Sequence, residues 1–561
     1  VDLGYETYRG VVNESTGLNV FKGIRFAAPP IGSLRWQASQ PPVGNAEGVT
    51  EADKFGPACP HSLRSGQDGR AFPSPISEDC LFLNVYAPQN ASGLPVLFMI
   101  HGGGYGVGDG REDLSNLINA NDNTFIGVSI QYRLGAFGFL AGDEVFRNGK
   151  VNAGILDQQA AAQWVQNHIE KFGGDPRQVT IFGISAGGGS VMLHDTAYGG
   201  TLGTSFFANS IAFSPYLPQQ YAYNDWIPSQ AYYAFASQAG CAAAWAHRNS
   251  SETTFQCLVS KDSETLQAAS NAVSSSGAFG TWAFLPVTDG VVIKSTPSEA
   301  LSKGKINGQN HLTSNVAEES FAFVPQEIKS KQDLQSWIDL VFPLFNRSNV
   351  DDLLSRYSTP DAQNELPKQA TSGNTGATAL ECSALATGYQ QIANLIYAES
   401  TFVCPSYWLA EAYNAGDKKG YKMQYSVPIA LHGYDGIALF GNTKLPNQGA
   451  DLVKAIQAIV GSFVTTGTPF IALDIAVLKY GGTKDLPAFT APVYAMLNLN
   501  QTGGQEVPVN STLDPRLNDV GASWYVEPDL RNAFSVVNGW EWEGGRGDRC
   551  EYWREIAAKV P

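Results

Sequence analysis

The sequence is poor in charged residues and lacks any long apolar run. Charged residues make up 16% of its 561 residues, below the ~25% of a typical soluble protein. Because no run of 18 or more apolar residues occurs, no transmembrane helix and no stable membrane insertion is predicted. Acidic residues outnumber basic ones by 52 to 36, which gives a formal net charge of −16. Such an acidic surface argues against nucleic acid and anionic membranes as partners.

Other features that the sequence lacks indicate the number of domains and the cellular location. The sequence has no internal repeat, no block of like charge and no long linker, so we predict a single domain over residues 1–561. The start, Val1-Asp-Leu-Gly, has no Met, no basic segment and no apolar segment, as expected of an end left by processing. Seven cysteines together with six N-x-S/T sequons favour a secreted, glycosylated protein. The sequons are at Asn13, Asn90, Asn249, Asn346, Asn500 and Asn510.

Apolar runs alternate with helical patterns in the first third of the chain. Continuous runs, as expected for strands covered on both faces, occupy residues 95–100, 125–132 and 179–182. From Asp157 to Phe172 the apolar residues fall on one helical face, with Asp157 as the expected cap and residues 173–176 as the stop. A second amphipathic helix is expected over residues 452–465. Strand, helix and strand in this order predict a parallel α/β unit.

A serine motif follows the third of these strands directly. Gly183-Ile-Ser185-Ala-Gly187 leads from the strand into a helical pattern. Small residues two positions before and after Ser185 are needed where a strand turns sharply into a helix and exposes a serine hydroxyl. This setting indicates a nucleophilic serine at the edge of a sheet. The pentapeptide alone also fits a plain glycine-rich turn, because the chain has 58 glycines.

A nucleophilic serine needs a base, and the chain order narrows the choice. The base is best a histidine that a buried carboxylate orients. Where this serine turn occurs, the partners follow in the order Ser, acid, His. Five of the seven histidines precede Ser185, lie on the helix just after it or fall in a cysteine loop. These criteria leave His311 and His432, together with many carboxylates between Ser185 and His432.

Motifs of one known family occur almost from end to end. They are Phe21-Lys-Gly-Ile-Arg-Phe-Ala-Ala-Pro-Pro, Ser77-Glu-Asp-Cys-Leu-Phe-Leu-Asn, His101-Gly-Gly-Gly, Asn152-Ala-Gly-Ile-Leu-Asp-Gln-Gln, Gly183-Ile-Ser-Ala-Gly, Pro286-Val-Thr-Asp-Gly, Asn315-Val-Ala-Glu and His432-Gly. The chain resembles the type B carboxylesterase/lipase family, the cholinesterase-like α/β-hydrolases, and is most similar to secreted fungal members. The resemblance implies an α/β-hydrolase fold, with a large mostly parallel central sheet flanked by helices and with inserted helical segments. It also implies hydrolysis of a small-molecule carboxylic ester through an acyl-enzyme, without a cofactor or a metal.

The family's catalytic groups correspond to residues of this sequence. Ser185 takes the place of the nucleophile and His432 that of the base. In the acid motif, Glu318 takes the catalytic place and Glu319 stands where glycine is usual, so a slip of one residue would make Glu319 the acid. The amides that match the oxyanion hole are those of Gly103, Gly104 and Ala186.

The resemblance also pairs six of the cysteines. The expected disulfides are Cys59–Cys80, Cys241–Cys257 and Cys404–Cys550. Cys382 is then left as a free buried thiol. Arg35 and Glu78 match a structural ion pair of the family.

Two departures from the family bear on the substrate. Ile184 precedes the serine where many relatives carry Glu, and the loop from Cys59 to Cys80 contains no tryptophan. A choline head would lack both its negative neighbour and its aromatic face, so we expect no cholinesterase. The same loop is short and polar, which favours an esterase without an apolar lid. A triacylglycerol lipase and a non-catalytic binding or adhesion protein on the same fold remain alternatives, and the oligomeric state stays open.

Overall fold

The structure is a computed structural model and describes most of the chain. The described residues are 1–44, 48–67, 75–241, 253–357, 385–442, 445–471, 485–511 and 514–560. The chain folds into two compact units. Unit 1 comprises Val1–Ile118, Asn123–Ala208 and Pro218–Thr296, and unit 2 comprises Asn119–Asp122, Asn209–Leu217 and Pro297–Pro561. The single domain over residues 1–561 stays a prediction.

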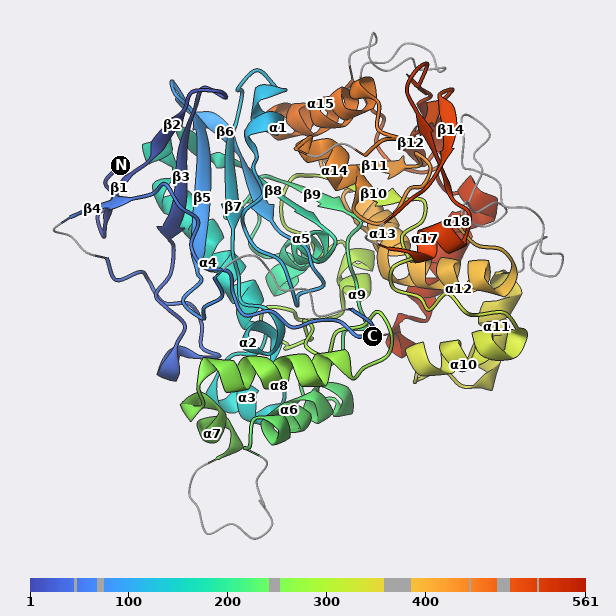
Figure 1. The fold of residues 1–561 in the computed structure, drawn as a ribbon, viewed down its shortest axis with the longest axis horizontal. Helices are drawn as coiled ribbons and strands as arrows, with labels where there is room; N and C mark the ends of the chain where they lie inside the picture. The colour runs from blue at the N-terminus through green and yellow to red at the C-terminus, as the bar shows by residue number, and fades with distance from the viewer. Residues whose placement is uncertain are drawn as a thin grey trace. The chain divides into compact units, whose positions relative to one another are not determined.

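Unit 1 carries the strand that leads to Ser185. This strand is β8 (Gly174–Ile184). The strands of unit 1 that follow it in the sheet are, in order, β6 (Leu94–Ile100), β7 (Ile126–Ile130), β5 (Phe82–Pro88), β3 (Leu18–Arg25) and β2 (Val11–Asn13). Strand β6 runs parallel to both β7 and β8, whereas β5, β3 and β2 pair antiparallel (Figure 1). Strand β7 is buried along its whole length, which explains its continuous apolar run. The short strands β1 (Thr7–Arg9) and β4 (Val49–Glu51) form a separate parallel pair.

Helix α4 of unit 1 confirms one predicted helix and corrects its start. It spans Ala153–His168 and continues as a 3₁₀ turn, Ile169–Phe172. Asp157 therefore lies inside the helix and is not its cap. Its buried carboxylate instead pairs with the Arg133 guanidinium at 2.7 Å and accepts the Arg133 N–H at 3.0 Å. Other helices in this part of the chain are α1 (Ser115–Asn119), α2 (Gly135–Phe139), α3 (Asp143–Asn148), α5 (Ala186–Thr196), α6 (Trp226–Gln238), α7 (Thr254–Ser260) and α8 (Ser263–Ser275).

Unit 2 carries a second set of neighbouring strands. In sheet order they are β9 (Asn209–Phe213), β10 (Asn310–Val316), β11 (Lys419–Tyr425), β12 (Ala495–Leu499) and β17 (Ser535–Asn538). The first four run parallel, and β17 pairs antiparallel with β12. Parallel strands end at the same edge of a sheet. The segments after β10 and β11 therefore leave the sheet side by side, and these two segments contain the predicted acid and base.

Helices and short hairpins complete unit 2. The helix predicted at 452–465 is α15 (Ala450–Thr466), which packs beside α14 (Tyr434–Phe440) (Figure 1). The remaining helices are α9 (Pro297–Ser302), α10 (Lys331–Val341), α11 (Arg347–Arg356), α12 (Gly388–Ala398), α13 (Cys404–Ala412), α17 (Arg516–Asp519) and α18 (Trp542–Glu555). The short antiparallel strands are β13 (Gln501–Thr502) with β16 (Arg531–Asn532), and β14 (Gln505–Pro508) with β15 (Ser523–Val526).

The predicted covalent and ionic ties are present. All three predicted disulfides form, with Cα–Cα distances of 5.0, 5.8 and 4.9 Å in chain order. The Arg35 guanidinium donates to both oxygens of Glu78, at 2.7 and 2.6 Å, and both side chains are buried. Cys382 and the sequon at Asn249 lie outside the described residues. Over the described ranges, no helix combines the length and the apolar character needed to cross a bilayer.

The structure shows that one of the predicted glycosylation sites is buried. Asn500 is only 3% exposed, and its side-chain oxygen accepts the N–H of Gln501 at 2.8 Å. A sugar on that amide would have to displace the surrounding core, so we expect Asn500 to stay unmodified in the folded chain. By contrast, Asn90, Asn346 and Asn510 are exposed and Asn13 is half-buried, and their modification stays a prediction.

Candidate active site

Ser185 occupies the sharp turn between β8 and α5. Its backbone has φ 60° and ψ −124°, a conformation that residues with a side chain rarely adopt. A Cβ at Gly183 would overlap the backbone of Gly187, and a Cβ at Gly187 would overlap the carbonyl of Ile100. Only glycine therefore fits two positions before and after the serine. The predicted turn is confirmed, and the catalytic role of Ser185 stays a prediction.

The glycine loop after β6 packs against this turn. A Cβ added to Gly102 would lie 3.0 Å from the Cβ of Ser185. Gly103 and Gly104 have φ values of 102° and 63°, and a Cβ on Gly104 would overlap the ring of Trp282. In the part of the chain that the structure describes, three amides near the serine donate no hydrogen bond and so remain available to a ligand oxygen. They are the predicted amides of Gly103, Gly104 and Ala186.

Two histidines support the glycine loop. His101 stacks on Tyr132 with ring centroids 4.4 Å apart, and the Tyr132 hydroxyl donates to the His101 carbonyl at 2.9 Å. Nε2 of His61 lies 3.0 Å from the carbonyl oxygen of Gly108. Burial lowers the pKa of His101 to about 4, so its ring is neutral at neutral pH. Both rings hold the loop, and the neutral His101 adds no fixed charge beside the predicted oxyanion amides.

In unit 2 the predicted base contacts Glu319 and not Glu318. Oε2 of Glu319 lies 2.5 Å from Nδ1 of His432, while its Oε1 accepts the N–H of Val316 at 2.8 Å. The side chain of Glu319 is 0% exposed and that of His432 is 12% exposed. The sequence-based choice of Glu318 as the partner of the histidine is therefore wrong, and the alternative that was left open is the one observed.

The path of the backbone explains this shift by one residue. The Glu318 N–H donates to the carbonyl of Ala430 at 2.9 Å, and Glu318 forms a parallel bridge with Leu431. This bridge fixes the backbone at Glu318, and the turn that begins at Glu319 brings the Glu319 side chain to the ring. Ser320, which is small and buried, follows Glu319 where the family usually has glycine after its acid. Aligning Glu319-Ser320 with that acid–glycine pair would have identified the residue from the sequence.

His432 presents its second nitrogen for chemistry. Phe323 and Phe402 pack against the ring, with centroid distances of 5.2 and 4.5 Å. With Nδ1 directed at the Glu319 carboxylate, the ring proton sits on Nδ1 and the lone pair on Nε2. Nε2 is buried and has no hydrogen-bond partner within the described residues. The ring is therefore in the tautomer that a general base needs.

Each of these groups lies just beyond the carboxyl end of a parallel strand. Ser185 follows β8 in unit 1, whereas Glu319 and His432 follow β10 and β11 in unit 2. Ligands of open α/β sheets bind outside these strand ends. Within the described ranges, no three His, Cys, Asp or Glu side chains are grouped as metal ligands would be. Unit 1 thus offers a nucleophile with nearby amide donors, and unit 2 offers an oriented base.

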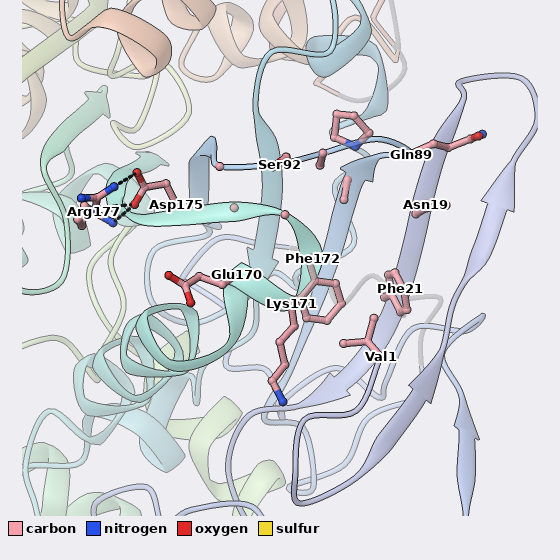
Figure 2. Close-up of a pocket in the computed structure, with 16 residues that line it drawn as sticks. Val1, Asn19, Phe21, Gln89, Ser92, Glu170, Lys171, Phe172, Asp175 and Arg177 are labelled. Carbon is pink, nitrogen blue, oxygen red and sulfur yellow. Dashed lines mark hydrogen bonds and ion pairs between the residues drawn. The ribbon is translucent and has the colours of Figure 1, made fainter.

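A surface pocket of unit 1 lies away from the serine. It has a volume of about 550 Å³ and is lined at the start of β8 by Asp175, and elsewhere by Phe21 and Phe172 (Figure 2). Asp175 is paired there with Arg177 at 3.0 Å. Because Ser185 follows the other end of this 11-residue strand, the pocket is not part of the predicted site.

Comparison with known proteins agrees with this geometry. The model of the carboxylesterase family matches residues 5–508. Carboxylesterase patB of Aspergillus clavatus is 29% identical over 87% of this chain and 91% of its own length. A secreted lipase of Arthroderma benhamiae is 31% identical over 79% of this chain and 77% of its own. The crystal structure of EstA from Aspergillus niger matches with a TM-score of 0.76 at 26% identity, over 100% of this chain and 98% of that one. The predicted α/β-hydrolase fold is confirmed.

Proposed function

This chain belongs to the carboxylesterase family and is a carboxylic ester hydrolase, and we propose that it cleaves its ester through a covalent acyl-serine. Ser185 Oγ attacks the ester carbonyl carbon while Nε2 of His432 takes the hydroxyl proton. The resulting oxyanion accepts hydrogen bonds from the amides of Gly103, Gly104 and Ala186. The imidazolium then returns its proton to the leaving alcohol oxygen. Water, activated by the same nitrogen, releases the acid and restores the serine.

The contact between Glu319 and His432 is the observation that carries this proposal. The buried carboxylate fixes the ring tautomer and stabilises the imidazolium that forms during attack. Its second oxygen is held by the Val316 N–H, so the carboxylate does not rotate away from the ring. The strained backbone of Ser185 and the three unused amides supply the other half of the same chemistry.

We assign simple soluble esters as the substrate class. Ile184 places an apolar side chain before the serine, where a cationic choline head would need a negative one. The described part of the loop after Cys59 is hydrogen-bonded in place: Ser62 N–H donates to the Gly106 carbonyl at 2.7 Å, and Ser65 N–H donates to the Thr281 carbonyl at 3.0 Å. These bonds favour a fixed rim over an apolar lid that opens at a lipid surface.

A triacylglycerol lipase is the second candidate, because relatives of this chain carry the name secreted lipase. A rate that jumps when a triglyceride passes its solubility limit would favour the lipase, and a rate that follows the dissolved ester alone would favour the esterase. We also propose an extracellular location, in line with those relatives and with the three disulfides.

Substitution of the nucleophile tests the mechanism. With a p-nitrophenyl ester, Ser185→Ala should lower kcat by up to about 10⁶-fold, as loss of the triad serine does in a serine protease. The variant should also lose labelling by a fluorophosphonate probe. Ser205→Ala, which changes an exposed serine of unit 1, should keep both properties. Full activity in Ser185→Ala would contradict the proposal, and an inactive wild-type chain would favour the binding-protein alternative.

A further inference from the structure

A third buried acid lies next to the proposed catalytic pair and has no part in the mechanism above. Asp435 is the third residue after His432 and lies in the first turn of α14. It is only 1% exposed. Its Oδ1 accepts the N–H of Gly436 at 2.9 Å, whereas its Oδ2 is buried and has no hydrogen-bond partner among the described residues. A buried carboxyl oxygen without a donor favours the neutral acid.

The groups that face Asp435 come from the same edge of unit 2. Burial first, and then the negative charge of Glu319, raise the pKa of Asp435 to about 7, while the charge of His432 acts in the opposite direction. The Ser314 side chain on β10 lies near enough to act as a donor to the carboxyl and so favours the ionised form, although no hydrogen bond of normal geometry reaches Oδ2. A buried carboxyl that feels the negative charge of a second carboxylate loses its proton less readily. Asp435 therefore changes its charge in the pH range in which a histidine acts as a base.

Two side chains of β11 also interact electrostatically with this acid. Burial lowers the pKa of the Lys422 ammonium, and the charges of Glu319 and Asp435 partly oppose that shift. The Lys422 Nζ donates to the side-chain oxygen of Asn315, next to the residue whose N–H holds Glu319. Burial raises the pKa of the Tyr425 hydroxyl, so this group stays neutral. Neither side chain donates to the free oxygen of Asp435.

We propose that Asp435 is a positioning residue that acts on the reaction through Glu319 and His432, by adding or withholding a second negative charge behind the imidazole. With its proton bound, Asp435 leaves Glu319 as the single anionic partner of the ring. Once ionised, it stabilises the imidazolium and keeps the base protonated to higher pH. This inference rests on the proposed role of His432 as the base, and it deepens that role by naming a group that sets its working range.

The pH profile of Asp435→Asn tests this role. Asn keeps the shape of the side chain but never carries the charge. We expect the acidic limb of kcat/KM, and of the rate of fluorophosphonate labelling, to move to lower pH by about 0.5 to 1 unit. Asp435→Glu restores a carboxylate and should bring the limb back toward the wild-type position. Glu411→Gln is the control, because Glu411 pairs with Arg554 and has no contact with the catalytic pair; its limb should match the wild type.

A limb that stays in place in Asp435→Asn, or that moves to higher pH, would overturn the proposal. A structural role alone would lower the melting temperature and leave the limb unchanged. If the Asn variant does not fold, the wild-type profile decides, because two coupled ionisations spread the limb beyond that of one group. A limb that fits one ionisation would then overturn the proposal. Failure of the proposed function shows differently, as activity that persists in Ser185→Ala.

Discussion

Replacing Glu319 by Gln tests the negative charge that faces Nδ1 of His432, because it removes this charge alone. The carboxylate lies 2.5 Å from Nδ1 of His432 and 2.8 Å from the N–H of Val316. Gln has the same shape, and its single oxygen still accepts the Val316 N–H. Its NH₂ group then faces Nδ1 and donates to it. The ring must hold its proton on Nε2, which is the nitrogen that has to accept the serine proton.

The size of the effect follows from that tautomer. The equivalent acid-to-amide change in a serine protease lowers kcat by about 10⁴-fold with the geometry intact. We expect Glu319→Gln to lower kcat by about 10³- to 10⁴-fold, which corresponds to roughly 4 to 5.5 kcal/mol of transition-state stabilisation. KM should change little, because Glu319 contacts the ring and not the substrate. Glu318→Gln should keep kcat within about tenfold, since the contact of Glu318 with Ala430 uses the backbone N–H.

Steady-state hydrolysis of a p-nitrophenyl ester by the two variants decides between the acids. Melting temperatures of both proteins, measured alongside, exclude a loss that comes from unfolding. If Glu318→Gln were folded and as impaired as Glu319→Gln, or more so, the assignment of the acid would be refuted. A Glu319→Gln enzyme with wild-type kcat would refute the need for an oriented ring.

Three further outcomes are expected. Gly104→Ala should lower kcat by about 10²-fold in ester hydrolysis, because the new Cβ meets Trp282 and moves the donor amide; unchanged kcat would exclude this amide from the oxyanion hole. Replacing Cys404 and Cys550 by Ser opens a loop of 146 residues. The free energy of unfolding, measured in urea, should fall by up to about 5 kcal/mol in the chain-entropy model. Unchanged stability would show that this disulfide does not stabilise the fold. Glycopeptide mapping of the secreted protein should find no sugar on Asn500, and an occupied Asn500 would contradict its burial.

The elements around Ser185 could be predicted from the sequence because their requirements are local. A buried strand, two obligatory glycines and a following helix are adjacent in the chain, and each has a steric cause that the structure shows at Gly183 and Gly187. The histidine could be found because chain order excluded most candidates and the family motif chose between His311 and His432. Disulfide pairing was predictable only from the resemblance, and the structure confirms it.

The remaining differences between the sequence-based predictions and the structure depend on contacts that sequence patterns do not contain. The choice between Glu318 and Glu319 is an exception, because the small Ser320 already aligns Glu319 with the acid of the family's acid–glycine pair. Asp157 fits the pattern of a helix cap, but α4 already begins at Ala153. The Asp157 carboxylate instead pairs with Arg133, 24 residues away in the chain. The sequon at Asn500 satisfies the glycosylation pattern, but its burial is a property of the packed core.

The most direct test of the central claim compares Ser185→Ala, His432→Ala and the double variant in one ester assay. Groups that act as one unit lose almost all of their effect with the first substitution. The double variant should therefore retain about the same residual kcat as either single variant. Losses that multiply in the double variant would show that the serine and the histidine act independently, and would contradict the account.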